Sequence, residues 1–386
     1  MNVSEYKSKE LIAQYGVRIP EGRVAWSAQE AEEQSRKIKS EKYVVKAQIG
    51  AGGRGLAGGI KFAAAPSSVR EEAQRMIGKT LVTAQTGEIG ELVHAVYVEA
   101  AVPIAQDFFI ALTLDPDTAQ PRLLASTRGG VEFEQMALMD PEIVKSCAFG
   151  ADEAGQSALS SFLEELGFPN VPGALEMLTC ARRAFVENDM TLLEINPFAL
   201  TKSGDWVAVD AKISLDGNAV FRHPEFETLA DEQHYSAAER IAQENDINLV
   251  KLTGNIGVVV NGAGLGLAIN DMLVDAGGKP ANFMDIRTTA SSFDIAKGVE
   301  LLLDDPNVRL ILLNVHGGGM TVCDTVAEGV AFAYSRTKRR LPLVVRLEGQ
   351  NVDWGLRILK DRNLPVEIFN DMTSAVNHAV ERAGRS

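Results

Sequence analysis

The stretch LLEINPFALTKSGDWVAVDAK, residues 192–212, decides how the N-terminal part of the chain is built. Apolar runs flank a K-S-G-D turn, which predicts two short strands joined as a hairpin. Glu194 and Asn196 share one face of the first strand, and Asp210 ends the second and can lie opposite them. Carboxylate and amide oxygens without Cys or His favour Mg²⁺, which takes its remaining ligands from water and phosphates. A half-buried hairpin with polar edges explains the same pattern, because E-x-N is short and common.

A second informative stretch, YVVKAQIGAGGRGLAGG, covers residues 43–59. A β-rich run delivers Lys46, and a loop with several glycines follows. Glycines let the backbone approach an anion closely, while Lys46 and Arg54 supply full positive charge. This combination suits the phosphate tail of a nucleotide, although the loop matches neither the P-loop nor G-x-G-x-x-G. A flexible surface hairpin is the alternative interpretation.

The run LVHAVYVEAAV, residues 92–102, predicts a strand that ends near Glu99, and Asp107 follows shortly after. A carboxylate that leaves a strand near a phosphate loop can accept hydrogen bonds from a ribose or an exocyclic amine. Either acid can equally be a solvated loop residue, and the spacing does not decide. Residues from about 147 to 170 form a polar, small-residue region, and a helix is expected to return the chain to the hairpin.

The bulk composition limits the class of protein. A chain of 386 residues is expected to hold two or three domains. Its 38 Lys and Arg against 52 Asp and Glu give a net charge of −14, which argues against a general binder of nucleic acids or anionic membranes. The start carries no apolar signal core and no apolar run reaches membrane-spanning length, so a cytoplasmic protein is expected. Three widely spaced cysteines are expected to be reduced thiols.

The C-terminal part alternates strand and helix patterns from residue 254 onward. This alternation predicts a parallel sheet covered by helices, with ligands at the carboxyl ends of the strands. The glycines of NGAGLG, residues 261–266, have the wrong spacing for a dinucleotide fingerprint. NVHGGGMTVCDTVAEGV, residues 314–330, reads as a buried strand, three glycines and a helix, which favours an anion site at the helix start.

Four motifs occur in an order that resembles a known family: KAQIGAGGRG (46–55), YVEA (97–100), EINP (194–197) and VDAK (209–212). The chain is similar to the β subunit of succinyl-CoA synthetase, in the ADP-forming acid–CoA ligase family that includes malate–CoA ligase. The resemblance implies an α/β chain with an α+β ATP-grasp domain in residues 1–230. It also implies a flavodoxin-like parallel-sheet domain in residues 251–386, and the polar stretch 231–250 is expected to connect the two.

The resemblance also implies roles for individual residues. The expected nucleotide-binding residues are Lys46, Gly53, Arg54, Gly55, Glu99, Val102 and Asp107, with Pro20 favouring adenine over guanine. Asn196 and Asp210 are the expected Mg²⁺ ligands, and Glu194 is expected to orient a visiting histidine as the catalytic carboxylate. The expected substrate-binding residues are Asn261, Gly318, Gly319 and Met320.

In the resembling family ATP phosphorylates a histidine of a separate α subunit, an acyl phosphate then forms, and CoA attacks it. No GHAGA-type phosphohistidine motif occurs in this chain, so a partner α subunit is expected. Two alternatives stay open: a self-contained ATP-grasp ligase that joins a carboxylate to an amine, and a nucleotide-binding regulatory subunit without ligase activity. Intact Glu194, Asn196 and Asp210 argue against the regulatory subunit.

The sequence departs from the family pattern at several places. Gly50 and Leu56 replace a histidine and a lysine of the glycine loop, and Asp107 replaces a glutamate. DIRTTA, residues 285–290, stands where the family has DVGGGA, and the GGGMTVCD loop is one residue longer and resembles the citrate-binding part of ATP-citrate lyase.

The new side chains are Arg287, Thr288 and Thr289, which add a charge and two hydroxyls and favour an acid other than succinate. Packing of Arg287 at a surface or subunit contact is the alternative.

His316 and Cys323 flank the glycine turn of the C-terminal part. A histidine there could accept a phosphoryl group. Occupation of an aromatic position near the strand end is favoured instead, because the resembling family keeps its phosphohistidine in the α subunit. Cys323, near a helix start, could have a lowered pKa, but nothing else marks it as a nucleophile.

Overall fold

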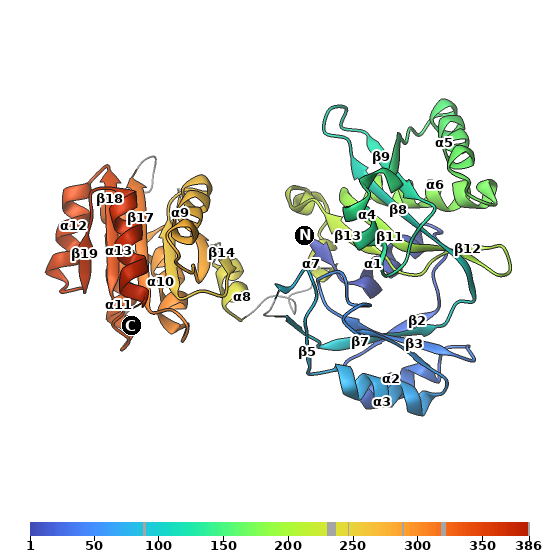
Figure 1. Ribbon diagram of the computed structural model, residues 1–386, viewed down its shortest axis with the longest axis horizontal. Helices are drawn as coiled ribbons and strands as arrows, with labels where there is room; N and C mark the ends of the chain where they lie inside the picture. Colours follow the sequence, from blue (N-terminus) through green and yellow to red (C-terminus); the bar gives the residue numbers. More distant parts are fainter. Residues whose placement is uncertain (88–89, 230–236, 246, 288, 318–321, 385–386) are drawn as a thin grey trace. The chain divides into compact units, whose positions relative to one another are not determined.

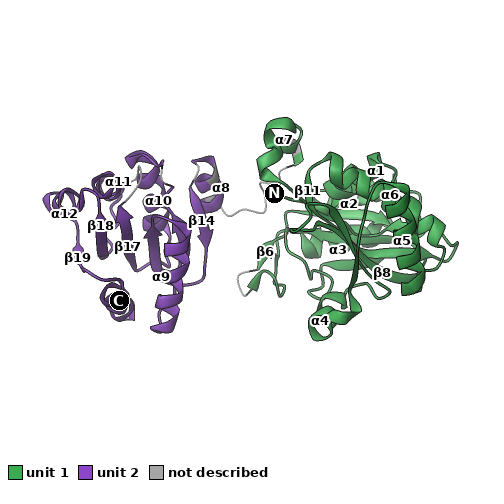
Figure 2. Ribbon diagram, turned by 90° about the horizontal axis from the view of Figure 1, so that it is seen from above, with its two compact units in different colours: residues 1–234 green, residues 235–386 purple. Residues whose placement is uncertain are grey.

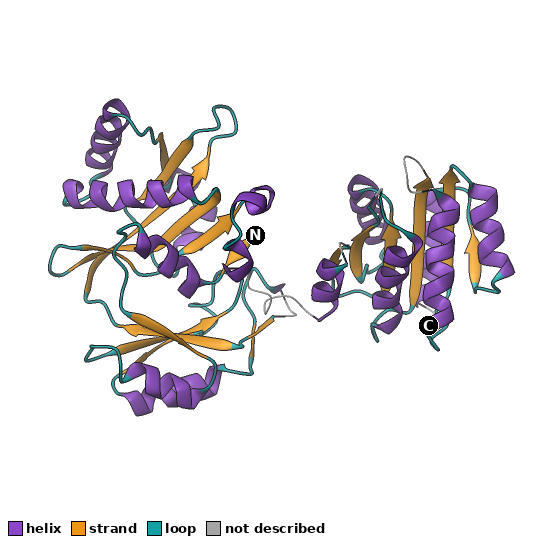
Figure 3. Cartoon of the chain, turned by 180° about the vertical axis from the view of Figure 1, so that it is seen from behind, coloured by secondary structure: helices purple, strands orange, loops and turns teal. Residues whose placement is uncertain are grey.

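The computed structural model describes residues 1–386 except 88–89, 230–236, 246, 288, 318–321 and 385–386 (Figure 1). The chain divides into two compact units, Met1–His234 and Tyr235–Ser386, which are coloured separately in Figure 2. None of the described helices is long and apolar enough to cross a membrane. Each unit combines helices and sheets, so the predicted α/β class is confirmed (Figure 3).

The described part of unit 1 is built on two larger sheets and a two-stranded ribbon. The large sheet runs in the order β1 (Asn2–Val3), β13 (Lys212–Leu215), β11 (Met190–Thr201), β8 (Ile104–Leu114), β9 (Pro121–Ser126) and β10 (Lys145–Ala148), with β12 (Trp206–Ala208) also on β11. The small sheet runs in the order β2 (Gly22–Ala25), β7 (Ala95–Ala100), β3 (Tyr43–Gln48) and β4 (Ile60–Ala63). The ribbon pairs β5 (Thr80–Leu81) with β6 (Glu91–Leu92).

Helices cover these sheets and close two separate cores. The core of the large sheet lies under α1 (Glu5–Gln14), α5 (Glu153–Leu166) and α6 (Val171–Glu187). The core of the small sheet lies under α2 (Ala28–Ser35) and α3 (Pro66–Met76), which are seen below it in Figure 1. The shorter helices are α4 (Phe133–Met139) and α7 (Phe226–Leu229), with 3-10 turns at Pro141–Ile143 and Gly217–Arg222.

The predicted hairpin is present in the large sheet. β11 and β12 are antiparallel, with Phe198 opposite Ala208, and the K-S-G-D turn joins them. Trp206 is fully buried and stacks on Phe198 with ring centroids 4.6 Å apart. The expected alternation also holds, because Leu193 and Ile195 are buried in the core while Glu194 and Asn196 face a cleft on the other side.

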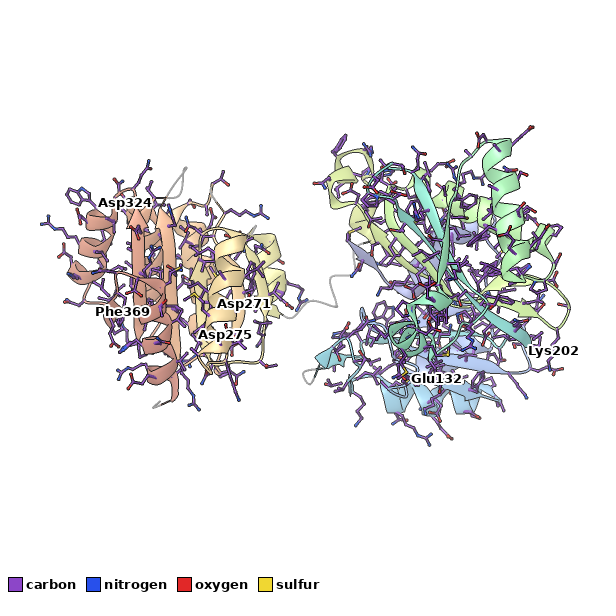
Figure 4. The ribbon with its side chains drawn as sticks, turned by 45° about the horizontal axis from the view of Figure 1, so that its top comes forward. Glu132, Lys202, Asp271, Asp275, Asp324 and Phe369 are labelled. Atoms are coloured by element: carbon purple, nitrogen blue, oxygen red, sulfur yellow. The ribbon has the colours of Figure 1, made fainter. Side chains whose placement is uncertain are left out.

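Unit 2 is a sheet in the order β14 (Asn248–Lys251), β16 (Asn282–Asp285), β15 (Ile256–Val260), β17 (Leu310–Gly317), β18 (Leu343–Gly349) and β19 (Val366–Ile368). The described strands are parallel except β14, which confirms the predicted parallel sheet. One face carries α9 (Ala263–Asp275) and α13 (Met372–Gly384), and the other carries α10 (Ser292–Asp304), α11 (Cys323–Arg336) and α12 (Val352–Asp361) (Figures 1 and 2). Asp271 and Asp275 lie on the exposed side of α9 (Figure 4).

Two polar segments of the sequence form elements of the folded units. The stretch expected to connect the domains contains α8 (Ala237–Glu244) and β14, and β14 pairs with β16 of unit 2. The polar region from about residue 147 begins within β10 and contains the helix α5. Asp152 caps α5 by accepting a hydrogen bond from the N–H of Gly155, and Gly167 ends the helix in the left-handed conformation.

Candidate functional site

A cleft of about 360 Å³ opens between the small and large sheets of unit 1. Strand β3, the glycine loop, the end of β7, the start of β8 and the hairpin all contribute side chains to it. Ten of the residues predicted from the sequence line this cleft: Lys46, Gly53, Arg54, Gly55, Glu99, Val102, Asp107, Glu194, Asn196 and Asp210. Pro20 is buried and does not belong to the residues that line the cleft.

The glycine loop is held at both ends by hydrogen bonds. The N–H of Gly50 donates to Glu91 Oε1 at 2.7 Å, and the N–H of Gly59 donates to the carbonyl of Arg54 at 2.8 Å. Gly53 has a φ of +75°, a conformation that side chains with a Cβ rarely adopt. A Cβ on Gly55 would lie 2.7 Å from a methyl of Val131. The loop therefore lines the cleft in a conformation that hydrogen bonds fix.

Lys46 is buried at the base of the cleft and has three partners. Its ammonium lies 2.9 Å from Glu5 Oε1 and 2.5 Å from Glu99 Oε1, and it donates to the carbonyl of Val209 at 2.8 Å. Glu99 also forms an ion pair with Lys9, which is completely buried. Both oxygens of Glu99 are thus engaged by cations beneath the cleft.

Arg54 lies beside Lys46 and joins the same network. Its Nη2 lies 2.5 Å from Glu5 Oε2 and 2.7 Å from Asp210 Oδ2, while Nη1 donates to the carbonyl of Ala47 at 3.0 Å. Glu5 therefore bridges the two cations that were predicted to bind phosphate, with one oxygen on each. Buried ions of opposite sign compensate for one another in this way because lone buried charges are costly.

The network shifts the pKa of its members. Burial alone would raise the pKa of Glu5, but Arg54, Lys46 and Lys9 hold it well below its ordinary value. Burial opposes the charged forms of Lys9 and Arg54, yet the surrounding carboxylates raise the pKa of both. Burial raises the pKa of Asp210, and Arg54 offsets only part of this effect.

Asn196 and Asp210, the predicted Mg²⁺ ligands, face the same cleft. Asn196 Oδ1 accepts a hydrogen bond from the N–H of Gly130 at 2.7 Å, and Asp210 pairs with Arg54. Among the described residues no group of three or more His, Cys, Asp or Glu side chains could hold a metal ion. Two oxygen donors fit Mg²⁺ only if phosphates and water complete its shell, as the sequence suggested.

Two further carboxylates face the cleft and are not tied to the ion network. Burial raises the pKa of Glu194, despite the charge of Lys212 nearby. Asp107 Oδ1 is buried and has no hydrogen-bond partner in the described structure, and burial raises the pKa of Asp107 too. A buried acceptor without a donor is costly, so Asp107 is prepared to accept a hydrogen bond from a ligand.

In unit 2, Asn261 follows β15 and links it to β17. Its Nδ2 donates to the carbonyl of His316 at 2.6 Å, and its Oδ1 accepts from the N–H of His316 at 2.7 Å. The side chain of His316 is exposed beside this link. Asp285 accepts a hydrogen bond from the N–H of Gly262 at 2.5 Å, so its carboxylate lies at the start of α9.

A cavity of about 420 Å³ lies beyond the carboxyl end of β16. Arg287 and Thr289 line it, as do the carboxylates of Glu244, Asp285 and Asp294. One guanidinium among three described carboxylates does not make a site for a polyanionic acid by itself.

The structure contradicts a lowered pKa for Cys323. Its thiol is fully buried at the start of α11 and donates to the carbonyl of Glu348 at 3.3 Å. Burial raises the pKa of Cys323, because it disfavours the thiolate. Burial also raises the pKa of Cys147, to about 11. The described thiols form no disulfide, as expected from the sequence.

Comparisons with known proteins agree with these two units. The family model of the ATP-grasp domain matches residues 2–200, and the CoA-ligase model matches residues 259–383. The β subunit of ADP-forming succinate–CoA ligase from Acidiphilium cryptum (strain JF-5) is 41% identical over 396 residues, covering 98% of this chain and 98% of that protein. Its counterpart from Staphylococcus aureus (strain JH9) is 41% identical over 385 residues, with 99% of both chains covered. This chain belongs to the β-subunit family of ADP-forming succinate–CoA ligase.

A solved structure with a similar fold is ATP citrate lyase from Methanothrix soehngenii, in complex with citrate and coenzyme A. The TM-score is 0.75 at 19% identity, covering 98% of this chain and 99% of that chain, so the likeness concerns the fold. Membership of the succinate–CoA ligase β-subunit family confirms the resemblance and the ADP-forming acid–CoA ligase class. It also implies ATP and CoA as substrates and an α subunit as partner.

Several residues that were predicted to bind the substrate belong to segments that the structure does not describe. Gly318, Gly319, Met320 and Thr288 lie outside the described residues. The anion site predicted at the start of α11 depends on the same segment and stays a prediction. The roles of Asn261, Arg287 and Thr289 in substrate binding also stay predictions.

Sequence reasoning missed Glu5 and Lys9. The structure buries both side chains on α1. A signal was present, because Glu5 and Lys9 are four residues apart and lie on the same stripe of α1 as buried Ile12. Charged residues on the buried stripe of an amphipathic helix indicate an internal ion network.

Proposed function

We propose that this chain binds ATP with Mg²⁺ in the cleft of unit 1 and passes the γ-phosphoryl group to a histidine carried by an α subunit. The phosphorylated histidine then converts a small carboxylic acid to an acyl phosphate, which CoA attacks to give an acyl-CoA and release phosphate. The convergence of Lys46, Arg54, Asn196 and Asp210 on one cleft supports this proposal, together with membership of the ligase family.

Each group in the cleft has a part in this reaction. Lys46 and Arg54 carry the positive charge that stabilises phosphate oxygens during transfer. Asn196 and Asp210 would hold Mg²⁺, which neutralises phosphate charge when bound. Asp107 supplies an acceptor for a hydroxyl or amine of the nucleoside, since its Oδ1 lacks a partner in the described structure.

Glu194 is proposed to orient the incoming histidine. Burial raises its pKa, so the carboxylate is more basic than an exposed one and is a stronger acceptor for an imidazole N–H. An oriented imidazole presents its other nitrogen to the γ-phosphorus. Replacement of Glu194 by Gln is expected to slow phosphorylation of the histidine more than it weakens ATP binding.

The acid is proposed to bind at the carboxyl ends of the strands of unit 2, with Asn261, the segment 318–320, Arg287 and Thr289 nearby. Substitution of glycines by Arg287, Thr288 and Thr289 favours an acid with an additional anionic or hydroxyl group, and therefore not succinate itself. Three carboxylates share the cavity with Arg287 and offset its positive charge. A further cationic group that binds the acid must therefore come from elsewhere, such as the α subunit.

The decisive experiment is acyl-CoA formation followed by mass spectrometry. The chain, co-expressed with its α subunit, is supplied with ATP, Mg²⁺ and CoA and with succinate, malate, citrate or a sulfonated carboxylate. Product from one acid identifies the substrate and requires ADP and phosphate in equal amount. A stable complex that binds ATP but forms no product from any acid would instead support a regulatory subunit.

Two variants make the assay specific. Glu194→Gln is expected to retain ATP binding and to lose phosphohistidine on the α subunit. Glu165→Gln, an exposed residue of α5, is the matched control and is expected to behave as the native chain. Product formed without the α subunit would contradict the proposal and favour a self-contained ligase.

A further inference from the structure

Glu5 is the centre of the ion network beneath the cleft, although no role was expected for it. Its Oε1 lies 2.9 Å from Lys46 and 3.1 Å from Lys9, and its Oε2 lies 2.5 Å from Arg54. Gln48 also donates to Oε2 at 3.2 Å. The residue is only 6% exposed, so these bonds are shielded from water.

This arrangement surrounds the ammonium of Lys46 with three oxygen partners in the described structure. Lys46 Nζ donates hydrogen bonds to Glu5 Oε1 and to the carbonyl of Val209, and it forms an ion pair with Glu99 Oε1. A phosphate oxygen can therefore bind Lys46 only if one of these partners is displaced. Glu5 is the partner that can yield most easily, because Lys9, Arg54 and Gln48 continue to hold it.

Arg54 is in a similar position. Both hydrogens of its Nη2 are committed to Glu5 and Asp210. The two oxygens of Glu5 thus contact the same pair of cations that a phosphate would contact. The carboxylate of Glu5 takes the place of a phosphate on these cations. The described network balances three cations, Lys9, Lys46 and Arg54, with three carboxylates, Glu5, Glu99 and Asp210.

We propose that Glu5 is a positioning residue that holds Lys46 and Arg54 beneath the cleft and competes with nucleotide phosphates for them. The negative charge of Glu5 fixes the positions of both cations, and it also lowers the affinity of the cleft for phosphate. Lys9 acts from the other side, because it attracts Glu5 and so weakens the competition. This role depends on the proposed nucleotide site, and it makes Glu5 the residue that sets the phosphate affinity of that site.

The proposal predicts opposite effects for two substitutions on one helix. Glu5→Gln removes the competing charge, so it is expected to tighten binding of metal-free tripolyphosphate about tenfold, the size expected for one charge-assisted contact. Lys9→Gln leaves Glu5 with only Lys46 and Arg54 as cationic partners and is expected to weaken binding by a similar factor. A purely structural role would weaken binding in both variants, because each disturbs the buried network.

The measurement is isothermal titration calorimetry of the full-length chain with sodium tripolyphosphate in the presence of EDTA. Glu10→Gln is the matched control, since Glu10 lies on the same helix and is exposed. Thermal unfolding is recorded in parallel, and Glu5→Gln is expected to melt lower without ligand and to gain more from tripolyphosphate. Glu5→Asp retains the charge on a shorter side chain and is expected to fall between the native chain and Glu5→Gln, so it serves if Glu5→Gln does not fold.

The outcomes separate this inference from the proposed function. No binding of ATP with Mg²⁺ or of tripolyphosphate by the native chain would overturn the nucleotide site itself. Native binding with weaker affinity in both Glu5→Gln and Lys9→Gln would leave the site intact and overturn the competing role of Glu5. Opposite shifts in the two variants, with Glu10→Gln unchanged, would support the role.

Discussion

At the scale of single residues, the cleft contains two kinds of acidic group. Glu5, Glu99 and Asp210 are paired with cations, and their charges hold Lys46 and Arg54 in place. Asp107, in contrast, has one buried oxygen without a partner among the described residues. In the proposed nucleotide site, the paired carboxylates hold the cations, and we assign the unpaired one to the donors of the nucleoside.

Replacement of Asp107 by Asn tests this assignment. Loss of the charged acceptor is expected to weaken ATP binding about tenfold and to leave tripolyphosphate binding unchanged, because only ATP has a nucleoside. Calorimetric titration of both ligands makes the comparison. Asp117→Asn, in the exposed turn between β8 and β9, is the control. Equal losses for ATP and tripolyphosphate would contradict a role at the nucleoside.

The pH dependence of ATP binding has a defined sign in the native chain. Burial raises the pKa of Asp107 above 3.8, so a proton is taken up at a higher pH than by an ordinary aspartate. The protonated form is a poorer acceptor, and ATP affinity therefore falls as the pH drops through this raised pKa. Asp107→Asn is expected to remove this component of the pH profile.

At the scale of elements, the β11–β12 hairpin carries the site because its other face is fixed in the core. Trp206 is fully buried against Phe198, Phe108 and Phe168, and its Nε1 donates to the carbonyl of Asn170 at 3.1 Å. The buried face positions Glu194 and Asn196 on the opposite face through the alternation of the strand. Packing at one end of the hairpin therefore determines geometry in the cleft.

Trp206→Ala tests this coupling. Loss of a large buried aromatic side chain is expected to destabilise unit 1 by about 3–5 kcal/mol and to accelerate hydrogen exchange in residues 190–215. Trp354→Ala is the matched control, because Trp354 is 61% exposed on α12 of unit 2 and is expected to change stability by no more than about 0.5 kcal/mol. Denaturant unfolding and hydrogen-exchange mass spectrometry provide the two readouts. Unchanged exchange of the hairpin would disprove the coupling.

At the scale of the whole molecule, the chain carries a net charge of −14, and its cleft is acidic as well. Among the described residues that line it, Lys46, Arg54 and Lys212 are cationic, whereas six are carboxylates: Glu5, Glu99, Asp107, Glu134, Glu194 and Asp210. A nucleotide triphosphate is expected to bind in such a cleft more tightly when it brings positive charge with it. Mg²⁺ is the expected source, with Asn196 and Asp210 as its protein ligands.

Removal of the metal is therefore expected to weaken ATP binding strongly. Two like charges 4 Å apart near a protein surface repel by about 4 kcal/mol, so a loss of roughly a thousandfold in affinity is expected when EDTA replaces Mg²⁺. Calorimetric titration of ATP with and without EDTA measures it. ATP binding of equal strength in EDTA would show that the cleft does not depend on a metal.

Local periodicity and motifs predicted the class of fold, the hairpin, the parallel sheet of unit 2 and ten of the residues that line the cleft. The motifs also indicated the ligase family. The burial of Glu5 and Lys9 as internal ions became evident only from the packed structure, as did the pairing of both oxygens of Glu99 with cations. The packed structure also shows that burial raises the pKa of Cys323. The physical reason is that burial and pairing join residues far apart in the chain: Glu5 meets Arg54, and Arg54 meets Asp210, only after the two sheets have packed around them.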